Sequence, residues 1–225
     1  MKGLMIPVML FGVSAAAQGS VIQQEPPLRA VIGDHVVLCD STRNKAARVA
    51  QEILRETGVA MDWITSVATE DIGTSYYQSV SRFRAGDLVV RILPTAAQGL
   101  PSPGLSLGVA IAGEPGEFGS HAYVYYDRVL RAAEFCKCDE IRILGHAIAH
   151  EIGHLLGLKH VISGTMCAGW NMSTLRLMSR GYVLFSLDEA RRMQTNAVAR
   201  NLRDVGADSD EPSRMQRRIA GKTRR

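Results

Sequence analysis

The segment GHAIAHEIGHLLGLKHVISGTMCAGW, residues 145–170, contains four of the six histidines of this 225-residue chain. Within it, HEIGHLLGLKH (150–160) places His150 and His154 four residues apart. On a helix this spacing puts both imidazoles on one face, one turn apart. Two neutral imidazoles in that arrangement can bind one Zn2+ at ~2.0–2.1 Å each. The segment therefore predicts a helix that carries a metal site, and it fixes how the rest of the chain is interpreted.

The residues around the two helical histidines complete the predicted site. Gly157 lets the chain leave the helix in a left-handed conformation, so that His160 can turn back as a third ligand. Glu151 points away from the ligands, near enough to take a proton from an attacking water. Three ligands leave the fourth position of zinc open, which is typical of a catalytic site. We expect one catalytic Zn2+ bound by His150, His154 and His160, with Glu151 as general base.

His146 is the fourth histidine of the segment and lies one turn before His150 on the same face. It could support a ligand through a hydrogen bond, bind a second ion, or pack in the core. We favour packing or a supporting hydrogen bond, because the other three histidines already complete the ligand set.

This segment resembles the signature of the metzincin clan of zinc metallopeptidases, H-E-x-x-H-x-x-G-x-x-H, at every fixed position. The clan also has a methionine in a tight turn under the metal, the Met-turn, and Met166 in SGTMCAG is the candidate. The short spacing from His160 to Met166 is similar to that of matrixin-like members and of uncharacterised secreted bacterial metzincin-like proteins. Val161 stands where the better-known families carry Ser, Asp, Glu or Pro, so no subfamily is assigned.

The resemblance implies an α+β fold of the zincin type. Its parts would be a mixed twisted β-sheet, an active-site helix, the Met-turn and a C-terminal helix. It also implies a secreted zinc-dependent endopeptidase, which hydrolyses peptide bonds by a zinc-activated water with Glu151 as general base. The expected partner is a peptide or protein substrate.

The resemblance further implies an edge strand above the cleft, which would bind an extended peptide through main-chain hydrogen bonds. The residues expected there are Ala122, Tyr123, Val124 and Tyr125. Their alternation is equally compatible with core packing. Side chains between Trp170 and Phe185, such as Leu175, Leu177 and Tyr182, are candidates for the wall of a pocket.

Two other functions fit the same motif. One is a catalytically inactive zinc-binding interaction protein, against which Glu151 argues, because a protein that only binds zinc needs no base. The other is an amidase or peptidase that acts on cell-wall peptides. Internal cuts in peptide libraries would separate an endopeptidase from the latter.

The composition, with 46% hydrophobic and 21% charged residues, is that of a globular protein. Residues 1–17 have the pattern of a secretory signal peptide, and their apolar run is too short to span a membrane. A linker (18–29) precedes the catalytic domain (30–203), with lobes 30–157 and 158–203. Residues 204–225 read as a disordered basic tail, without the aromatic residues of a nucleic-acid-binding arm. We expect a secreted monomer without stable membrane insertion or nucleic-acid binding.

Hydrophobic periodicity predicts the order of the elements. Strands are expected in 29–40, 59–67 and 87–94, with two more in 107–129. One helix should begin at Ser41 or Thr42 and end at Gly58, and the metal-site helix should begin at Asp139. A last helix starts with the capping box Ser186–Glu189. Its expected apolar face comprises Leu187, Ala190, Met193, Ala197, Val198 and Leu202.

The chain contains four cysteines, which in an exported protein tend to pair. Cys136 and Cys138 have one residue between them and are poorly placed to bond each other. We therefore expect each to join one of the distant pair, Cys39 and Cys167. The alternative is that one or more remain reduced and buried.

Overall fold

The computed structural model describes residues 26–34, 38–67, 86–96, 104, 106–111, 113 and 118–220, with side chains described up to Arg203. The expected signal peptide lies outside the described residues. The strands are β1 (Leu28–Asp34), β2 (Met61–Val67), β3 (Leu88–Leu93), β4 (Gly108–Ile111) and β5 (His121–Tyr125). The helices are α1 (Asp40–Arg55), α3 (Tyr126–Cys136), α4 (Glu140–Leu155), α5 (Met172–Ser179) and α6 (Leu187–Ala220).

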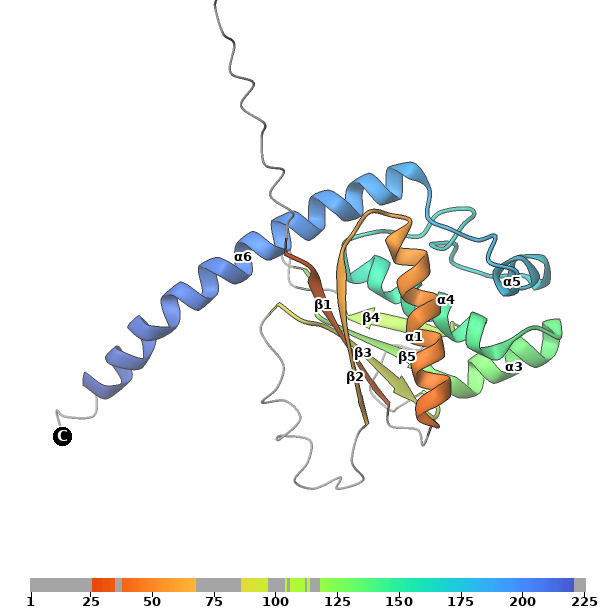
Figure 1. Ribbon diagram of the computed structural model, residues 1–225, viewed down its shortest axis with the longest axis horizontal. Coiled ribbons are helices and arrows are strands. Elements are labelled where there is room, and N and C mark those ends of the chain that lie inside the picture. The colour runs from red at the N-terminus through yellow and green to blue at the C-terminus, as the bar shows by residue number, and fades with distance from the viewer. Residues whose placement is uncertain are drawn as a thin grey trace, which may run out of the picture.

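The strands form one mixed sheet in the order β2-β1-β3-β5-β4. Four of them run parallel, and β4 pairs antiparallel with β5. Helices α1 and α4 pack against each other beside the sheet (Figure 1). The predicted mixed sheet, the metal-site helix and the final helix are thus all present, and the strand predictions are confirmed.

The expected position of the edge strand is wrong. Residues Ala122, Tyr123, Val124 and Tyr125 belong to β5, which is paired on both sides, with β3 and with β4. Three of these residues are fully buried, and β4 forms the edge of the described sheet. The alternation along β5 therefore reflects core packing, the alternative reading of the same pattern. Residues 108–111 occupy the edge instead.

The core lies between the sheet and the helices α1 and α4. Alternate residues of three strands are buried there, including Ile32, Val90 and Val124. The two helices cross closely at Gly145, where an added Cβ atom would lie 2.5 Å from the Cβ of Val49. Because no side chain larger than glycine fits at this crossing, Gly145 fixes α4, and with it the histidines, against α1.

Helix α6 crosses the end of the sheet at which the parallel strands begin (Figure 1). Buried Arg200 donates hydrogen bonds to the carbonyl oxygens of Gly86 at 3.1 Å and Gly119 at 2.8 Å. Gln194 and Asn196 donate to the carbonyls of Thr57 and Leu156, which end α1 and α4. Helix α6 therefore holds together the ends of two helices and two strands.

The beginning of α6 matches its prediction, whereas its far end does not. Ser186 Oγ accepts from the Glu189 amide at 3.3 Å, and Glu189 Oε2 accepts from the Ser186 amide at 2.7 Å, as a capping box requires. Leu187 and Leu202, expected on the apolar face, are exposed, and buried Arg200 lies on that face instead. The helix continues to Ala220 across residues expected to form a disordered tail, although they include Gly206 and Pro212, which disfavour a helix. None of the described helices is long and apolar enough to cross a membrane.

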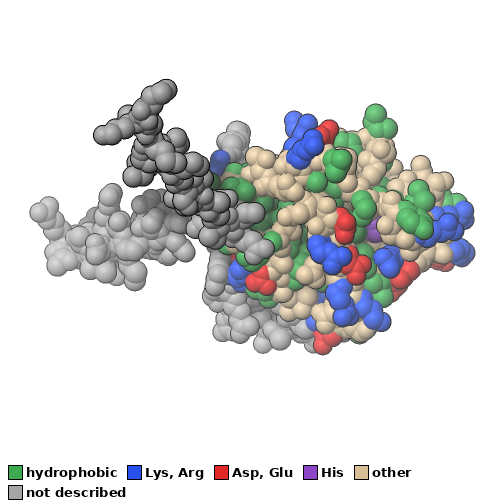
Figure 2. Space-filling view, turned by 45° about the horizontal axis from the view of Figure 1, so that its top comes forward, with side chains coloured by type: hydrophobic (Ala, Val, Ile, Leu, Met, Phe, Trp, Pro, Cys, Tyr) green, Lys and Arg blue, Asp and Glu red, His purple; other side chains and the backbone are tan. Residues whose placement is uncertain are grey.

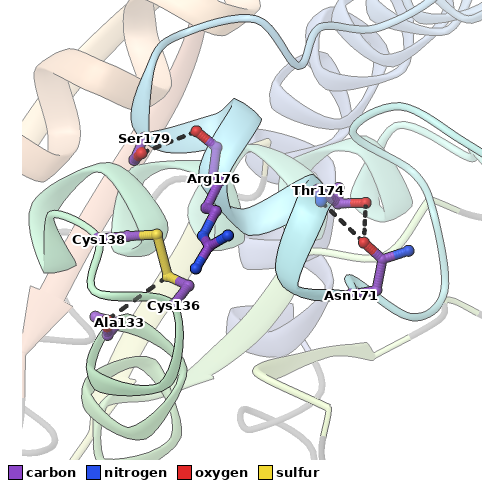
Figure 3. Close-up of a disulfide and its surroundings, with 7 residues drawn as sticks. All are labelled: Ala133, Cys136, Cys138, Asn171, Thr174, Arg176 and Ser179. Carbon is purple, nitrogen blue, oxygen red and sulfur yellow. Dashed lines mark hydrogen bonds between the residues drawn. A yellow bond between two sulfur atoms is a disulfide. The ribbon is translucent and has the colours of Figure 1, made fainter.

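The cysteine pairing also differs from the prediction. Cys136 and Cys138 form a disulfide with each other at the end of α3, beside α5 (Figure 3), while Cys39 and Cys167 are free thiols. The reason is Lys137, which ends α3 in the left-handed conformation with φ of 55°. This turn brings the two cysteine Cα atoms within 5.3 Å. Residue spacing alone does not show such a turn.

Candidate metal centre

Three imidazole nitrogens converge on one point. The Nε2 atoms of His150 and His154 are 3.1 Å apart, those of His154 and His160 are 3.0 Å apart, and those of His160 and His150 are 3.3 Å apart. Two of these rings come from consecutive turns of α4, and the third comes from the chain that follows it. The three residues can hold one metal ion.

Two main-chain carbonyls fix the orientation of the helical histidines. His150 Nδ1 lies 2.7 Å from the carbonyl oxygen of Thr165, and His154 Nδ1 lies 2.9 Å from that of Leu158. A carbonyl oxygen only accepts hydrogen bonds, so Nδ1 carries the proton in both rings and Nε2 carries a lone pair. Such carbonyl partners are typical of histidines that bind metals.

The arrangement fits a tetrahedral zinc site. Ligands at 2.0–2.1 Å from a tetrahedral ion lie about 3.3 Å from one another, close to the observed separations. Burial lowers the pKa of His150 to about 4 and also lowers that of His154. Both rings are therefore neutral near pH 7, with lone pairs that face each other at 3.1 Å and have no proton between them. A cation bound among these lone pairs would relieve their repulsion.

Local sequence explains how the chain builds this geometry. Asp139 caps α4 by accepting from the Ile141 amide at 2.9 Å, as predicted. Gly157 has φ of +79°, which confirms the predicted left-handed exit from the helix. The chain then returns through a bridge between Val161 and Cys167, in which the Val161 amide donates to the Met166 carbonyl at 3.0 Å. These features place His160 opposite the helical pair.

Met166 is fully buried against α4. A Cβ atom added to Gly153 would lie 2.6 Å from the Met166 Sδ atom. Gly153 separates the two helical histidines by sequence, and Thr165, next to Met166, holds His150. Met166 therefore packs directly on the helical turn that carries His150 and His154.

Glu151 is buried at the floor of the site, with 4% of its side chain exposed. Its Oε2 atom has no hydrogen-bond partner among the described residues. Burial alone raises the pKa of this carboxyl to about 8. The edge strand covers it, since a Cβ atom added to Gly108 would lie 2.6 Å from Glu151 Oε1. The carboxyl is therefore held in a desolvated position between β4 and α4.

The histidines open into a cleft of about 1200 Å3. Its walls come from β4, from one face of α3, and from the segment 167–175 that follows Met166. The rings of Trp170 and His150 pack edge to face, with centroids 5.4 Å apart. Histidine contributes only a small patch to the surface on the face shown in Figure 2.

The pocket wall was only partly predicted. Leu175 lines the cleft, whereas Leu177 and Tyr182 are 45% and 72% exposed on the outer surface. The wall formed by α3 was missed altogether. Its helical signal was available, because the buried residues Val129, Ala133 and Cys136 follow a helical period.

His146 does not belong to the metal group. It is 1% exposed, and its ring nitrogens face the carbonyls of Arg142 at 2.8 Å and Val183 at 3.3 Å. Of the two favoured interpretations, packing is the one that the structure shows, because both ring nitrogens face main-chain carbonyls and neither contacts one of the three converging histidines. The second contact connects α4 to the segment that leads into α6.

Comparisons with known proteins show a likeness at the level of structure. No family model matches the chain, and no curated protein matches it. Among solved structures, a crystal structure of archaemetzincin from Methanopyrus kandleri is similar with a TM-score of 0.48 and 15% sequence identity. The likeness covers 76% of this chain and 95% of that one.

Proposed function

We propose that this protein is a zinc-dependent endopeptidase of the metzincin type. One observation carries the proposal: three imidazole Nε2 atoms converge within 3.3 Å of one another, beside a buried carboxylate and in a cleft bordered by a sheet edge. A structural zinc site would be closed by four protein ligands. Here three ligands face an open cleft.

His150, His154 and His160 would hold the zinc. When bound there, zinc would supply Lewis-acid chemistry, which polarises a carbonyl group and acidifies water. The chain prepares this set before any ligand arrives, because the carbonyls of Thr165 and Leu158 keep both helical rings in the tautomer with a free Nε2. Little reorganisation of the two helical ligands is then needed on binding.

Glu151 would move the proton. Its carboxyl lies one residue from the first ligand, and its Oε1 atom is held against β4. In this position it would accept a proton from the attacking water and deliver it to the leaving amine. Burial raises the pKa of this carboxyl to about 8, which brings it close to neutral pH, where the group can both accept and deliver a proton.

Strand β4 would bind the substrate. Its residues Gly108, Val109, Ala110 and Ile111 line the cleft, and its outer edge has no partner strand in the described sheet. An extended peptide could add to this edge through main-chain hydrogen bonds. Because such bonds do not depend on side chains, they favour peptides as a substrate class. A peptide bound to β4 in this way would also pass the three histidines.

The decisive experiment measures zinc content and proteolysis together. The purified protein should contain one zinc per chain and make internal cuts in a denatured protein mixture, and chelation should abolish the cuts reversibly. Glu151→Gln should keep the zinc and the fold but lose cleavage by about 100-fold or more. Glu52→Gln, an exposed glutamate on α1, is the matched control and should cleave like the wild type.

Other outcomes would redirect the proposal. Zinc without any cleavage would favour a binding protein that keeps the site. Cleavage confined to cell-wall peptides would favour the amidase. Absence of zinc from a folded protein, with no uptake of added zinc, would contradict the proposal at its root.

We also propose that the mature protein is exported and begins after residue 17. The support is the signal-like pattern of residues 1–17 together with the Cys136–Cys138 disulfide, since disulfides persist mainly in oxidising compartments. The intact mass of the protein recovered outside the cytoplasm measures the cleavage point. A full-length mass in the cytoplasmic fraction would contradict export.

A further inference from the structure

One face of α3 forms a wall of the cleft. The residues that line it recur at helical spacing: Arg128, Arg131, Ala132 and Phe135. Two of the four are arginines, and none is acidic. Phe135 is 65% exposed although it is large and apolar. A helix face of this composition, inside a cleft, points to a ligand with a negative charge and an apolar part.

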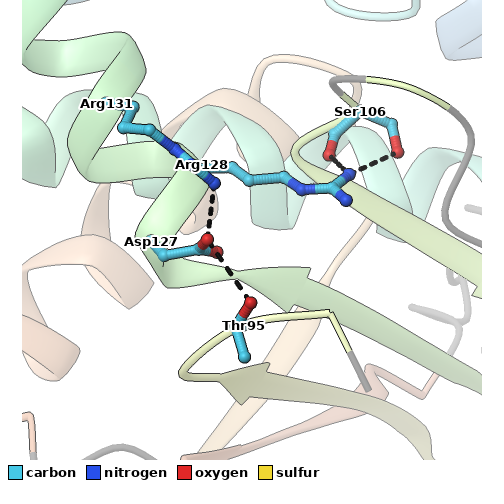
Figure 4. A network of polar contacts seen from close by, with 5 residues as sticks. All are labelled: Thr95, Ser106, Asp127, Arg128 and Arg131. Carbon is cyan, nitrogen blue, oxygen red and sulfur yellow. Dashed lines mark hydrogen bonds and ion pairs between the residues drawn. The ribbon is translucent and has the colours of Figure 1, made fainter. Parts of the chain in front are cut away.

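Arg128 is fixed at the beginning of the edge strand (Figure 4). Its Nη1 atom donates to the carbonyl oxygen of Ser106 at 2.6 Å and to Ser106 Oγ at 3.5 Å. Its guanidinium lies over the Tyr125 ring, 4.8 Å from the centroid. Ser106 lies two residues before Gly108, so Arg128 marks one end of the predicted peptide path.

Arg131 lies one turn further along the same face of α3. Its Nη2 atom donates to Asp127 Oδ2 at 2.5 Å, and that oxygen also accepts from the Thr95 hydroxyl at 3.4 Å (Figure 4). This bond to Asp127 fixes the Nη2 end of the Arg131 guanidinium. A guanidinium has five N–H donors, so others remain for a ligand. The Arg131 side chain is 67% exposed and can therefore be reached from the cleft.

Among the described residues that line the cleft, arginines outnumber residues with a carboxyl group. Among the described residues that line it, the carboxylate-bearing side chain is Glu151, which is buried beside the histidines. Asp127 offsets part of the charge on α3 but does not line the cleft. The wall formed by α3 therefore presents the guanidinium groups of Arg128 and Arg131 to the cleft. A carboxylate of a bound chain would fit there.

We propose that Arg128 and Arg131 bind a carboxylate of the peptide substrate at the Ser106 end of β4. The proposal rests on the proposed function, because it takes the ligand to be a peptide that lies along β4. Arginine pairs with carboxylates through two parallel N–H···O bonds, a geometry that lysine does not offer. The carboxylate can be an Asp or Glu side chain or the C-terminus of the peptide, and the test separates these sources.

The test measures equilibrium binding to zinc-loaded Glu151→Gln protein, so that it does not depend on turnover. The probes are fluorescent apolar octapeptides that carry Glu or Gln at each position in turn, each with a free or an amidated C-terminus. At one position we expect the Glu peptide to bind about tenfold more tightly than its Gln counterpart. Added salt should reduce this preference, because the site is partly exposed.

Variants then assign the preference to the arginines. Arg131→Gln should bring the Glu-to-Gln affinity ratio close to one, and Arg131→Lys should give an intermediate ratio. Arg191→Gln is the matched control, since Arg191 is also an exposed arginine paired with an aspartate, Asp188 at 3.5 Å, but lies outside the cleft. It should keep the full ratio. Arg128→Gln is the less specific test, because it also frees Ser106.

Each result decides the proposal. A preference that follows Glu supports recognition of internal acidic residues, and one that follows the free C-terminus supports recognition of the chain end. Equal binding of all peptides, no binding of any, or a preference that survives in Arg131→Gln overturns it. Cleavage by the wild-type protein is measured separately, so failure of the peptidase function is distinguishable from failure of the carboxylate site.

Discussion

Gly108 on the edge strand and Glu151 on the ligand helix are in such close contact that no side chain fits between them. A Cβ atom at Gly108 would lie 2.6 Å from Glu151 Oε1 and 2.6 Å from the Tyr123 carbonyl oxygen. Contacts of carbon atoms at that distance are strongly repulsive. The main chain of the edge strand therefore determines where the proposed base lies.

Gly108→Ala should displace Glu151 or push β4 away from β5. We expect kcat/KM for peptide cleavage to fall by about 10- to 100-fold, because small misplacements of a reacting group have effects of that size. Zinc content should not change, since no ligand is touched. Gly169→Ala is the control: Gly169 lines the same cleft, and an added Cβ atom there meets nothing within 4 Å. Equal kinetics of the two variants would contradict the role of Gly108.

The stability of the metal-free protein should depend on pH through Glu151. Burial raises its pKa in the folded state to about 8, from an ordinary value of 4.5. Between these values the folded state binds more protons at this group than the unfolded state does. Its contribution to stability is thus present at low pH and is lost as the pH rises towards 8.

Urea unfolding of the metal-free wild type and of Glu151→Gln at several pH values measures this effect. From pH 5 to 8 the wild type should lose stability relative to the variant, by at most about 1.4 kcal/mol per pH unit. The opposite linkage of His150, whose pKa burial lowers to about 4, is common to both proteins and cancels. Parallel curves for the two proteins would show that Glu151 is not desolvated.

Zinc should stabilise the fold by joining α4 to the segment that follows it. At a free zinc concentration of about 1,000 times Kd, the free energy of unfolding should rise by about 4 kcal/mol. His160→Ala should lose most of that gain, yet match the metal-free wild type, because the His160 side chain is exposed. Thermal unfolding with and without a chelator measures both quantities. An equal zinc-induced rise in Tm for the variant would exclude His160 as a ligand.

Met166 should matter both to packing and to the metal. Met166→Ala is expected to cost about 2–5 kcal/mol, and Met166→Leu less than about 1.5 kcal/mol, in the free energy of unfolding. Zinc affinity should also fall in Met166→Ala, because the neighbouring Thr165 carbonyl holds His150. Met178→Ala removes an equally buried methionine on α5 and should destabilise the fold without changing zinc affinity. Similar zinc affinities for the two Ala variants would refute this coupling.

The cysteine pairing predicts a labelling pattern. Alkylation before reduction should modify Cys39 and Cys167 but not the bonded pair Cys136 and Cys138. Cys39 should react first, because hydrogen bonding with Thr42 lowers its pKa and its side chain is exposed. Peptide mass mapping measures both outcomes. A disulfide that joins Cys39 or Cys167 to Cys136 or Cys138 would restore the pairing expected from sequence.

The sequence by itself determined the candidate ligand set and the elements that carry it. The spacing of His150, His154 and His160 around Gly157 is a local pattern: three residues lie within eleven positions, and one glycine sets the turn. Local backbone geometry is enough to bring such groups together. The same holds for the caps at Asp139 and Ser186, whose bonds span only a few residues.

Only the tertiary structure decided what surrounds that site. The edge strand was assigned to β5 instead of β4, because edge position depends on pairing between distant strands and not on the alternation within one. Gly108 meets Glu151, and Arg131 enters the cleft, through contacts between elements that local patterns do not specify. The convergence of the three histidines could be predicted because their geometry is local, whereas the desolvation of Glu151 and the walls of the cleft result from packing across the whole sheet.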